Sequence, residues 1–470
     1  MASKIARPTA NTLNKLHSRL VGILGESKVS TARAVLEQHG KDLTYHPVMA
    51  PDIVCFPGTT DEVSKVVKAC AEDRVPIVPF GAGTSLEGHI TAPFGGVSLD
   101  LSRNMTQIKN VRVEDLDCTV QAGVTRNQLN AHLKDTGLFF SVDPGADATL
   151  GGMVSTRASG TTAVRYGTMR DVTVNLEVVL PSGEVIQTTK RSRKTSAGYN
   201  LTSLMVGAEG TLGVVTEATL RLQGVPAAVC AASCAFPNLE SAVMCSQLII
   251  QAGIPIARCE FLDEECVKAV NKDSHLGQRE VPTLFLEFHG ASESALKEQV
   301  DMVQQMALDF GGEEFHMTFA PEDRTRLWKA RHHAWHACTA LKPDALAWSS
   351  DVCVPISKLA ECVSETKKDI ENAKLLAPIV GHVGDGNFHC FFIISKNDPS
   401  ELDRAKIVNE RMVRRAISLD GTITGEHGIG IGKQKYLIEE LGPVAVDVMR
   451  AVKNAIDPLG IMNPGKIFST

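Results

Sequence analysis

Three glycine-rich runs constrain the fold of this chain more than any other feature. They read GAGTSLEG (81–88), DPGADATLGGMVSTRASG (143–160) and VGAEGTLGVVTEATL (206–220), and each is attached to a segment with strand character. Because glycine has no Cβ, successive backbone N–H groups in such turns are exposed and can bind a diphosphate without a lysine. One glycine turn is usually only a turn. Three in one region predict a backbone that closes around one large, planar, phosphate-bearing cofactor.

Two glycine segments imitate nucleotide-binding motifs without satisfying them. The first run lacks the third glycine of G-x-G-x-x-G at the required place, and residues 89–101 after it have no helical pattern. A dinucleotide fold needs that helix, because its N-terminus binds the pyrophosphate. The segment GIMNPGKI (460–467) places Ile467 where a P-loop has its magnesium-binding Ser or Thr. These departures disfavour NAD and argue against a P-loop.

The pattern of strands and helices changes once along the chain. Short strands, a helix over 59–74 and a hairpin over 172–188 characterise the first half. After residues 223–228 strands alternate with long helices, which we predict over 294–312 and 321–341. A chain of 470 residues is too long for one compact core. We therefore predict a boundary near 223–228 and a second domain of α+β type.

Composition excludes several classes of protein. The formal net charge is −6, so we expect no nucleic acid partner. No apolar run approaches the roughly 18 residues of a membrane helix, so we expect no transmembrane segment. Twelve cysteines without a C-x-x-C pair favour free thiols in a reducing compartment. The basic residues 1–25 fit the end of a transit sequence or an ordinary amphipathic helix.

Two histidines surround a glycine-rich turn between apolar strands, GHVGDGNFHC (381–390). His382 and His389 lie there, and GEHGIG (425–430) supplies Glu426. A lone histidine is usually packed in a core or solvated. Two imidazoles and one carboxylate instead suit a divalent transition metal with positions left for substrate or water. Zn²⁺, Mn²⁺ and Fe²⁺ remain alternatives from the residues alone, although an iron oxygenase would not explain the glycine runs.

The glycine runs, the closing NPGK, DVCVPIS (351–357) and the two histidine-bearing turns together resemble one flavoprotein family over about residues 45–468. It is the vanillyl-alcohol-oxidase/PCMH family, in its branch of FAD-linked D-2-hydroxyacid dehydrogenases. Within that branch the chain resembles the cytochrome-type mitochondrial D-lactate dehydrogenases. The resemblance implies an α+β fold with a PCMH-type FAD-binding domain, a substrate or cap domain, and a C-terminal segment that returns to the flavin. The implied segments are 1–46 (N-terminal, helical), 47–224 (FAD-binding), 225–425 (cap, with the metal site) and 426–470 (C-terminal).

The resemblance also implies which residues hold FAD. Thr84 stands where relatives with a covalently attached flavin often have a histidine, so we expect non-covalent FAD. The diphosphate would lie on the first run, the ADP and ribityl part on the second, the adenine side on the third, and the isoalloxazine beside NPGK. The positions are Pro79, Gly81, Ala82, Gly83, Thr84, Ser85, Pro144, Gly145, Gly151, Thr156, Ser159, Gly160, Gly213, Val215 and Asn463.

The family pattern assigns chemistry to a few further residues. His427, next to Glu426, corresponds to the general base, and Arg331 to the clamp on the substrate carboxylate. His382, His389 and Glu426 correspond to a Zn²⁺ or Mn²⁺ site. Trp335, Trp348 and Asn387 are further candidates for the substrate pocket, although large aromatics are more often core residues. Ser349 replaces a lysine of the hydroxyglutarate branch, which favours a monocarboxylate such as D-lactate.

The resemblance also sets expectations for partners. We expect electrons to pass to cytochrome c or another carrier, a mitochondrial location and possibly a homodimer. A D-2-hydroxyglutarate or glycolate dehydrogenase of the same build is the alternative enzyme. A non-catalytic flavin- or metal-binding subunit is a third reading, but it predicts a damaged site, whereas the metal, base and clamp residues are all present.

Overall fold

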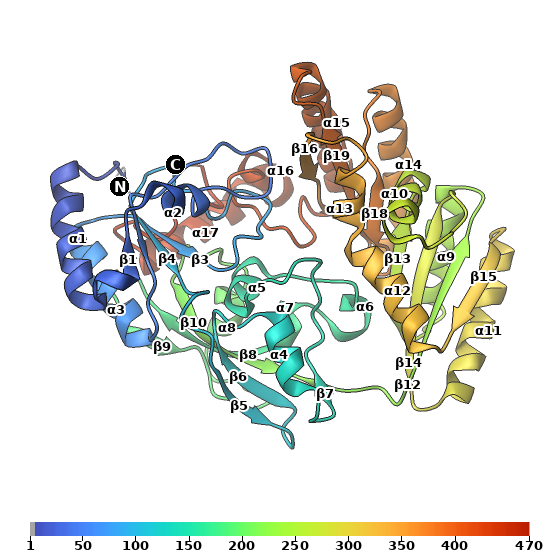
Figure 1. Ribbon diagram of the computed structural model, residues 1–470, viewed down its shortest axis with the longest axis horizontal. Coiled ribbons are helices and arrows are strands. Elements are labelled where there is room, and N and C mark those ends of the chain that lie inside the picture. Colours follow the sequence, from blue (N-terminus) through green and yellow to red (C-terminus); the bar gives the residue numbers. More distant parts are fainter. Residues whose placement is uncertain (1–4, 470) are drawn as a thin grey trace. The chain divides into compact units, whose positions relative to one another are not determined.

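The computed structural model describes residues 5–469, which divide into two compact units (Figure 1). The first unit runs up to Ala158, resumes over Thr168–Gly224 and ends with the segment that begins at Glu426. The second unit comprises Ser159–Gly167 and Val225–Gly425. One change of unit therefore falls between Gly224 and Val225, where the sequence pattern also changes.

A four-stranded sheet carries the first glycine run. Its order is β1 (Val29–Ser30), β2 (Ile53–Cys55), β4 (Val97–Asp100) and β3 (Ile77–Phe80). Helices α1 (Ala10–Leu24) and α3 (Thr60–Glu72) share its apolar core. Helix α3 begins as predicted because the Thr59 hydroxyl accepts the Glu62 N–H. Strand β3 leads directly into Gly81, and Met462 of the C-terminal segment bridges to Ile77 in this strand.

A five-stranded antiparallel sheet forms the rest of the first unit's core. Its order is β5 (Ile108–Arg112), β6 (Asp117–Gln121), β10 (Val214–Arg221), β8 (Thr173–Val179) and β9 (Val185–Gln187). The hairpin predicted over 172–188 is β8–β9. The remaining elements are α2 (Arg33–Gln38), α4 (Arg126–Leu133), α5 (Leu150–Thr156), α7 (Met169–Val172), α8 (Leu201–Met205), α16 (Gln434–Leu441), α17 (Pro443–Ile456), and β7 (Leu138–Phe139) paired with β11 (Gln223–Gly224).

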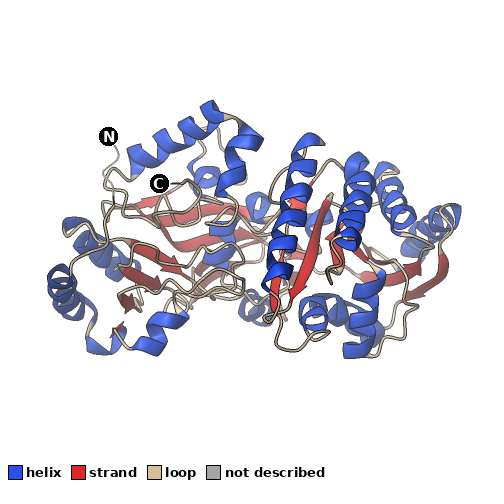
Figure 2. Cartoon of the chain, turned by 90° about the horizontal axis from the view of Figure 1, so that it is seen from above, coloured by secondary structure: helices blue, strands red, loops and turns tan. Residues whose placement is uncertain are grey.

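An eight-stranded antiparallel sheet is the centre of the second unit. Its strands are β15 (Glu313–Thr318), β12 (Ala228–Ala235), β14 (Thr283–Gly290), β13 (Ile256–Leu262), β18 (Ile379–His382), β19 (Asn387–Ile394) and β16 (Leu346–Ser349), with β17 (Val352–Cys353) also paired to β19. Helices cover both faces (Figure 2). One face carries α10 (Glu264–Ser274), α12 (Pro321–His332) and α13 (Ala334–Thr339), and the other α9 (Leu239–Gln251), α11 (Glu293–Asp309), α14 (Ile356–Asn372) and α15 (Pro399–Ser418).

Three features depart from the sequence prediction. The helix predicted over 321–341 is two helices, α12 and α13, which are separated at His333, where ψ is 0°. Helix α5 forms inside the second glycine run, where Gly151 and Gly152 obscure a helical pattern. Helices α16 and α17 occupy the C-terminal segment, for which no helix was predicted. Helix α17 does carry a recognisable start, with Pro443 directly after Gly442.

The structure describes the state of the cysteines and the hydropathy of the helices. All twelve cysteines are free thiols, and only Cys353 is not fully buried. Between residues 5 and 469 no helix combines the length and the apolar character needed to span a bilayer.

Candidate active site

His382 and His389 lie on the same face of the second unit's sheet. In the β18–β19 register His382 is opposite Asn387, so His389, two residues further along, is its diagonal neighbour. The ring centroids are 5.4 Å apart, and a nitrogen of one ring lies within 4.8 Å of a nitrogen of the other. The exposed fractions are 7% and 4%. The strand–turn–strand predicted around GHVGDGNFHC thus brings both imidazoles to one place.

Hydrogen bonds determine which nitrogen of each ring can bind a metal. His382 Nδ1 lies 2.8 Å from Glu260 Oε1, and His389 Nδ1 lies 3.0 Å from the Ser350 carbonyl oxygen. Both partners are acceptors, so Nδ1 donates in each ring. Nε2 then carries the lone pair in the neutral ring, as a metal ligand requires. Two buried imidazoles oriented in this way fit a divalent metal.

Arg331 is held by the same carboxylate as His382. Its Nη2 is 2.6 Å from Glu260 Oε2, and the arginine is 8% exposed. The Arg331 Nε is buried and has no hydrogen-bond partner among residues 5–469. A buried guanidinium N–H without an acceptor is costly, and the carboxylate of a ligand could satisfy it. Arg331 therefore does not lie on a solvated helix face.

Glu260 is the residue of this site that the sequence analysis missed. It is 1% exposed in strand β13, and it lies opposite His382 when the β13–β18 register is continued by one residue. A carboxylate between apolar neighbours in a strand is a usable signal, because such groups are buried only with partners. The sequence near Glu260 does not identify those partners, which are His382 on β18 and Arg331 on α12.

Asn387 and Asp351 organise the backbone beside His389. Asn387 Nδ2 donates to Asp351 Oδ1 and to the Val352 carbonyl, both at 2.7 Å. Thr424 Oγ1 donates to Asp351 Oδ2 at 2.6 Å. A Cβ on Gly425 would come within 2.3 Å of Asn387 Nδ2. Glycine at 425 therefore allows the chain to pass next to the histidine turn immediately before Glu426.

The two tryptophans proposed for the pocket face opposite sides of the sheet. Trp335 on α13 packs edge-on against Phe391, which shares its face with His389. Trp348 pairs with Phe392 across β16 and β19 and therefore points to the other face. We accordingly leave Trp348 out of the proposed site and treat it as a core residue.

The GEHGIG turn is anchored within the first unit by Glu209. Its carboxylate accepts the N–H groups of Ile429 at 2.7 Å and Gly430 at 2.8 Å, and His89 Nε2 lies 3.3 Å away. Burial alone would raise the pKa of Glu209, but His89 and the two N–H groups outweigh it and hold that pKa below its ordinary value. Glu426 and His427 stand at the start of this turn, and their side chains are 13% and 12% exposed. Glu209 was also missed, although it lies in the third glycine run.

The first two glycine runs meet around Thr149 in the first unit. A Cβ on Gly81 would lie 2.3 Å from Thr149 Oγ1, and one on Gly152 would lie 3.0 Å from it. The hydroxyls of Thr149 and Ser85 are buried without a hydrogen-bond partner in the described part of the chain. Gly83 has a φ of +72°, a backbone conformation that residues other than glycine rarely adopt. Buried hydroxyls without a hydrogen-bond partner, next to glycine backbone, are expected of a site that binds a diphosphate. These residues therefore fit FAD.

Close packing, rather than a cofactor, accounts for other glycines of the three runs. A Cβ on Gly151 would meet Ala122 at 2.5 Å, and one on Gly213 would meet Val178 at 2.7 Å. Val215 is a core residue of β10. Gly145 is exposed, whereas Pro144 and Thr156 are half-buried. Ser159 and Gly160 belong to the second unit.

The NPGK segment is buried in the first unit. Asn463 Nδ2 donates to the carbonyls of Glu209 at 2.7 Å and His89 at 3.2 Å. Lys466 Nζ donates to the Thr91 carbonyl at 2.7 Å. Burial lowers the pKa of Lys466 to about 7, although Glu209 opposes this shift. Asn463 thus joins the third glycine run to the chain after the first.

A Lys466→Met variant should change how stability depends on pH. The folded-state pKa of Lys466 is about 7, below the ordinary lysine value, so the unfolded chain binds the additional proton between these two values. The free energy of unfolding of the parent should therefore rise with pH from about 7 towards about 10. The free energy of unfolding of the variant should not show this rise. Its excess over that of the parent should be largest at pH 7 and below. Denaturant titrations across this range check it, with exposed Lys297→Met as the control; parallel curves for parent and Lys466→Met would contradict it.

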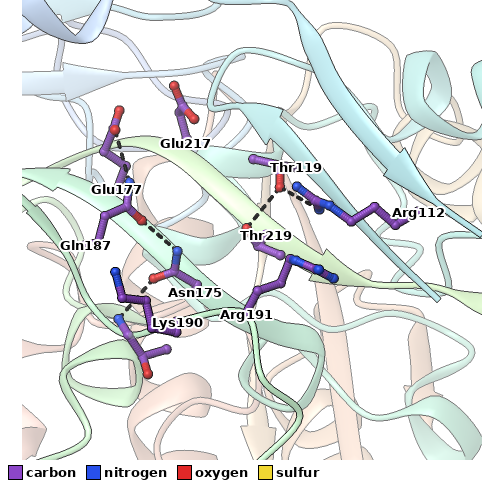
Figure 3. Close-up of a pocket in the computed structure, with 10 residues that line it drawn as sticks. Arg112, Thr119, Asn175, Glu177, Gln187, Lys190, Arg191, Glu217 and Thr219 are labelled. Carbon is purple, nitrogen blue, oxygen red and sulfur yellow. Dashed lines mark hydrogen bonds between the residues drawn. The ribbon is translucent and has the colours of Figure 1, made fainter. Parts of the chain in front are cut away.

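A separate pocket of about 280 Å³ lies on the five-stranded sheet (Figure 3). Cross-strand neighbours such as Thr119 and Thr219 line it, with Arg112 donating to Thr119. The residues that line it are all polar or charged, and none of them is a histidine or a glycine. The pocket therefore contributes none of the groups described above.

Comparison with known proteins places the chain in a family. Residues 225–467 match the model of FAD linked oxidases, C-terminal domain, and residues 51–189 match a FAD binding domain. The chain belongs to the FAD-linked oxidase family, which confirms the family resemblance and FAD as the cofactor. A protein of Danio rerio named "Probable D-lactate dehydrogenase, mitochondrial" is 51% identical over 97% of this chain and 92% of its own length. The "D-lactate dehydrogenase [cytochrome], mitochondrial" of Arabidopsis thaliana is 46% identical over 92% of this chain and 76% of its length.

A solved structure confirms the predicted fold. p-Cresol methylhydroxylase with substrate bound superposes with a TM-score of 0.79, covering 98% of both chains at 17% identity. At this identity the likeness concerns the fold alone. The PCMH-type architecture implied by the family resemblance is therefore the observed one.

Proposed function

We propose that this protein oxidises D-lactate to pyruvate with non-covalent FAD, with D-2-hydroxy monocarboxylates of similar size as further substrates. The observation that carries the proposal is the meeting of His382 and His389, on one face of the sheet, with Arg331 of helix α12 at Glu260. The Arg331 Nε is buried there and lacks an acceptor among residues 5–469. The names of the two relatives support D-lactate as the substrate.

His382, His389 and Glu426 are the proposed ligands of a Zn²⁺ or Mn²⁺ ion. The two imidazoles present Nε2 as the unprotonated nitrogen. Glu426 directly follows Gly425, where an added Cβ would lie 2.3 Å from Asn387 Nδ2, and consecutive Cα atoms are only about 3.8 Å apart. Chain continuity therefore supports Glu426 as the carboxylate ligand. A two-histidine, one-carboxylate set suits either ion.

The residues divide the work of the reaction between binding and proton transfer. When bound, FAD supplies the hydride acceptor and the divalent metal supplies Lewis-acid chemistry. Arg331 binds the substrate carboxylate and so orients Cα. His427, in the turn anchored by Glu209, takes the hydroxyl proton as a neutral imidazole. Asn387 holds the backbone of 351–352 beside His389, which makes it a positioning residue.

Substrate breadth and electron transfer extend the proposal. Ser349 is buried and offers no cation for a second carboxylate, so dicarboxylates should be poor substrates. Both names support a mitochondrial location. The word cytochrome in the Arabidopsis name supports a cytochrome as the acceptor, for which we propose cytochrome c or another carrier. A homodimer remains part of the proposal.

An anaerobic titration tests the proposed activity. Purified protein loaded with FAD is mixed with D-lactate, then with L-lactate, glycolate and D-2-hydroxyglutarate, while the visible flavin band is followed. We expect D-lactate to bleach the band, L-lactate to leave it unchanged, and D-2-hydroxyglutarate to react weakly. Bleaching by D-2-hydroxyglutarate ahead of D-lactate would instead support the alternative dehydrogenase. A flavin that none of these acids reduces would refute oxidation of 2-hydroxy acids.

A further inference from the structure

Glu260 contacts two groups that the proposed reaction uses for different purposes. Its Oε1 is 2.8 Å from His382 Nδ1, and its Oε2 is 2.6 Å from Arg331 Nη2. The carboxylate is 1% exposed on strand β13, whose other inward residues are apolar or paired. Burying a charge is costly unless partners compensate it, and removing one partner is strongly destabilising. His382 and Arg331 are therefore joined through one shared anion.

We propose that Glu260 is a positioning residue that couples metal binding by His382 to carboxylate binding by Arg331. This inference rests on the proposed function and assigns a role to a residue outside it. Through Oε1, Glu260 fixes the His382 ring and keeps its Nε2 unprotonated, as a ligand must be. Through Oε2 it fixes the guanidinium of Arg331, while Arg331 Nε is left to meet the substrate.

The shared anion has a thermodynamic consequence. Without substrate, Glu260 is the only anion of this set that Arg331 contacts, and the carboxylate interacts with both Arg331 and His382. When Arg331 also binds a substrate carboxylate, its interaction with Glu260 weakens. The Glu260 carboxylate then interacts more strongly with His382, which becomes a stronger metal ligand. By linkage, an occupied metal site must then favour carboxylate binding to the same extent.

The neighbouring strand offers a matched control. Glu287 on β14 is 5% exposed and pairs with Arg258 Nη1 at 3.1 Å and His289 Nε2 at 2.8 Å. It is thus a second buried glutamate shared by one arginine and one histidine on the same sheet. If the loss of any buried Arg–Glu–His set weakened metal and substrate binding, substitution of either glutamate should have the same effect. The histidine partner of Glu260 is a proposed metal ligand, whereas His289, the histidine partner of Glu287, is not.

The experiment compares Glu260→Gln and Glu287→Gln with the wild type, all loaded with FAD. Mn²⁺ binding is measured by the electron paramagnetic resonance of free Mn²⁺, and kcat and KM are measured for D-lactate. We expect Glu260→Gln to weaken Mn²⁺ binding by about 10- to 100-fold, the usual effect of losing a group that orients a ligand. Its KM for D-lactate should also rise. Glu287→Gln should change neither quantity, even where it lowers thermal stability.

Each outcome decides the proposal. Unchanged Mn²⁺ affinity in folded Glu260→Gln, or equal losses in both glutamate variants, would overturn it while leaving the proposed function intact. A wild type that binds neither Mn²⁺ nor Zn²⁺ would overturn the metal set and the coupling together. If Glu260→Gln does not fold, Arg331→Met decides, because it leaves Glu260 wholly to His382. Mn²⁺ should then bind more tightly than to the wild type, and an unchanged affinity would overturn the coupling.

Discussion

His389→Ala should abolish turnover of D-lactate and metal binding while leaving FAD bound. His389 would supply one of three metal ligands, and its ring is buried with Nδ1 already engaged by the Ser350 carbonyl. Losing a ligand should weaken metal binding by more than the about 10- to 100-fold typical of losing an orienting partner. The residues that fit the FAD diphosphate, Gly81 and Thr149, belong to the first unit, so the flavin spectrum should persist. Metal content by mass spectrometry, flavin absorbance and steady-state turnover are the three measurements.

His316→Ala is the matched control for this prediction. His316 lies on strand β15 of the same sheet, but it is exposed and distant in strand order from β18 and β19. The control should keep metal, flavin and turnover. Full activity in His389→Ala would refute the metal assignment, and loss of FAD together with the metal would show that the substitution disrupts the fold rather than one site.

Much of this architecture could be predicted from the sequence because its signals are local. Helix α3 follows from Thr59 as its N-cap, and β18–β19 follow from apolar runs on either side of a glycine turn. The pairing of His382 with His389 is also nearly local, since the register of one hairpin-like pair brings them together. Predictions failed where a local pattern is ambiguous, as in α5, whose glycines have low helix propensity but pack closely against Ala122.

The supporting residues could not be predicted, because their partners are distant in the sequence. Glu260 meets His382 across 122 positions, and Glu209 meets Gly430 across 221. In each case a carboxylate in an apolar or glycine-rich segment signals that a partner exists, but only the fold identifies it. The face that Trp348 occupies was equally beyond prediction, because it depends on the register of β16, which the sequence does not give.

His427→Ala should lower kcat for D-lactate by about 10²- to 10⁴-fold, the range expected for loss of a general base. The turn that carries His427 is held through the backbone N–H groups of Ile429 and Gly430, so replacing the side chain should leave the turn, FAD and metal in place. Added imidazole should restore part of the rate, because a small base can occupy the space of the missing ring. Ile429→Val is the control in the same turn and should keep kcat, because its N–H group still reaches Glu209. A variant that keeps most of its kcat would show that another group takes the hydroxyl proton, and lost metal without rescue by imidazole would assign His427 to the metal site instead of to proton transfer.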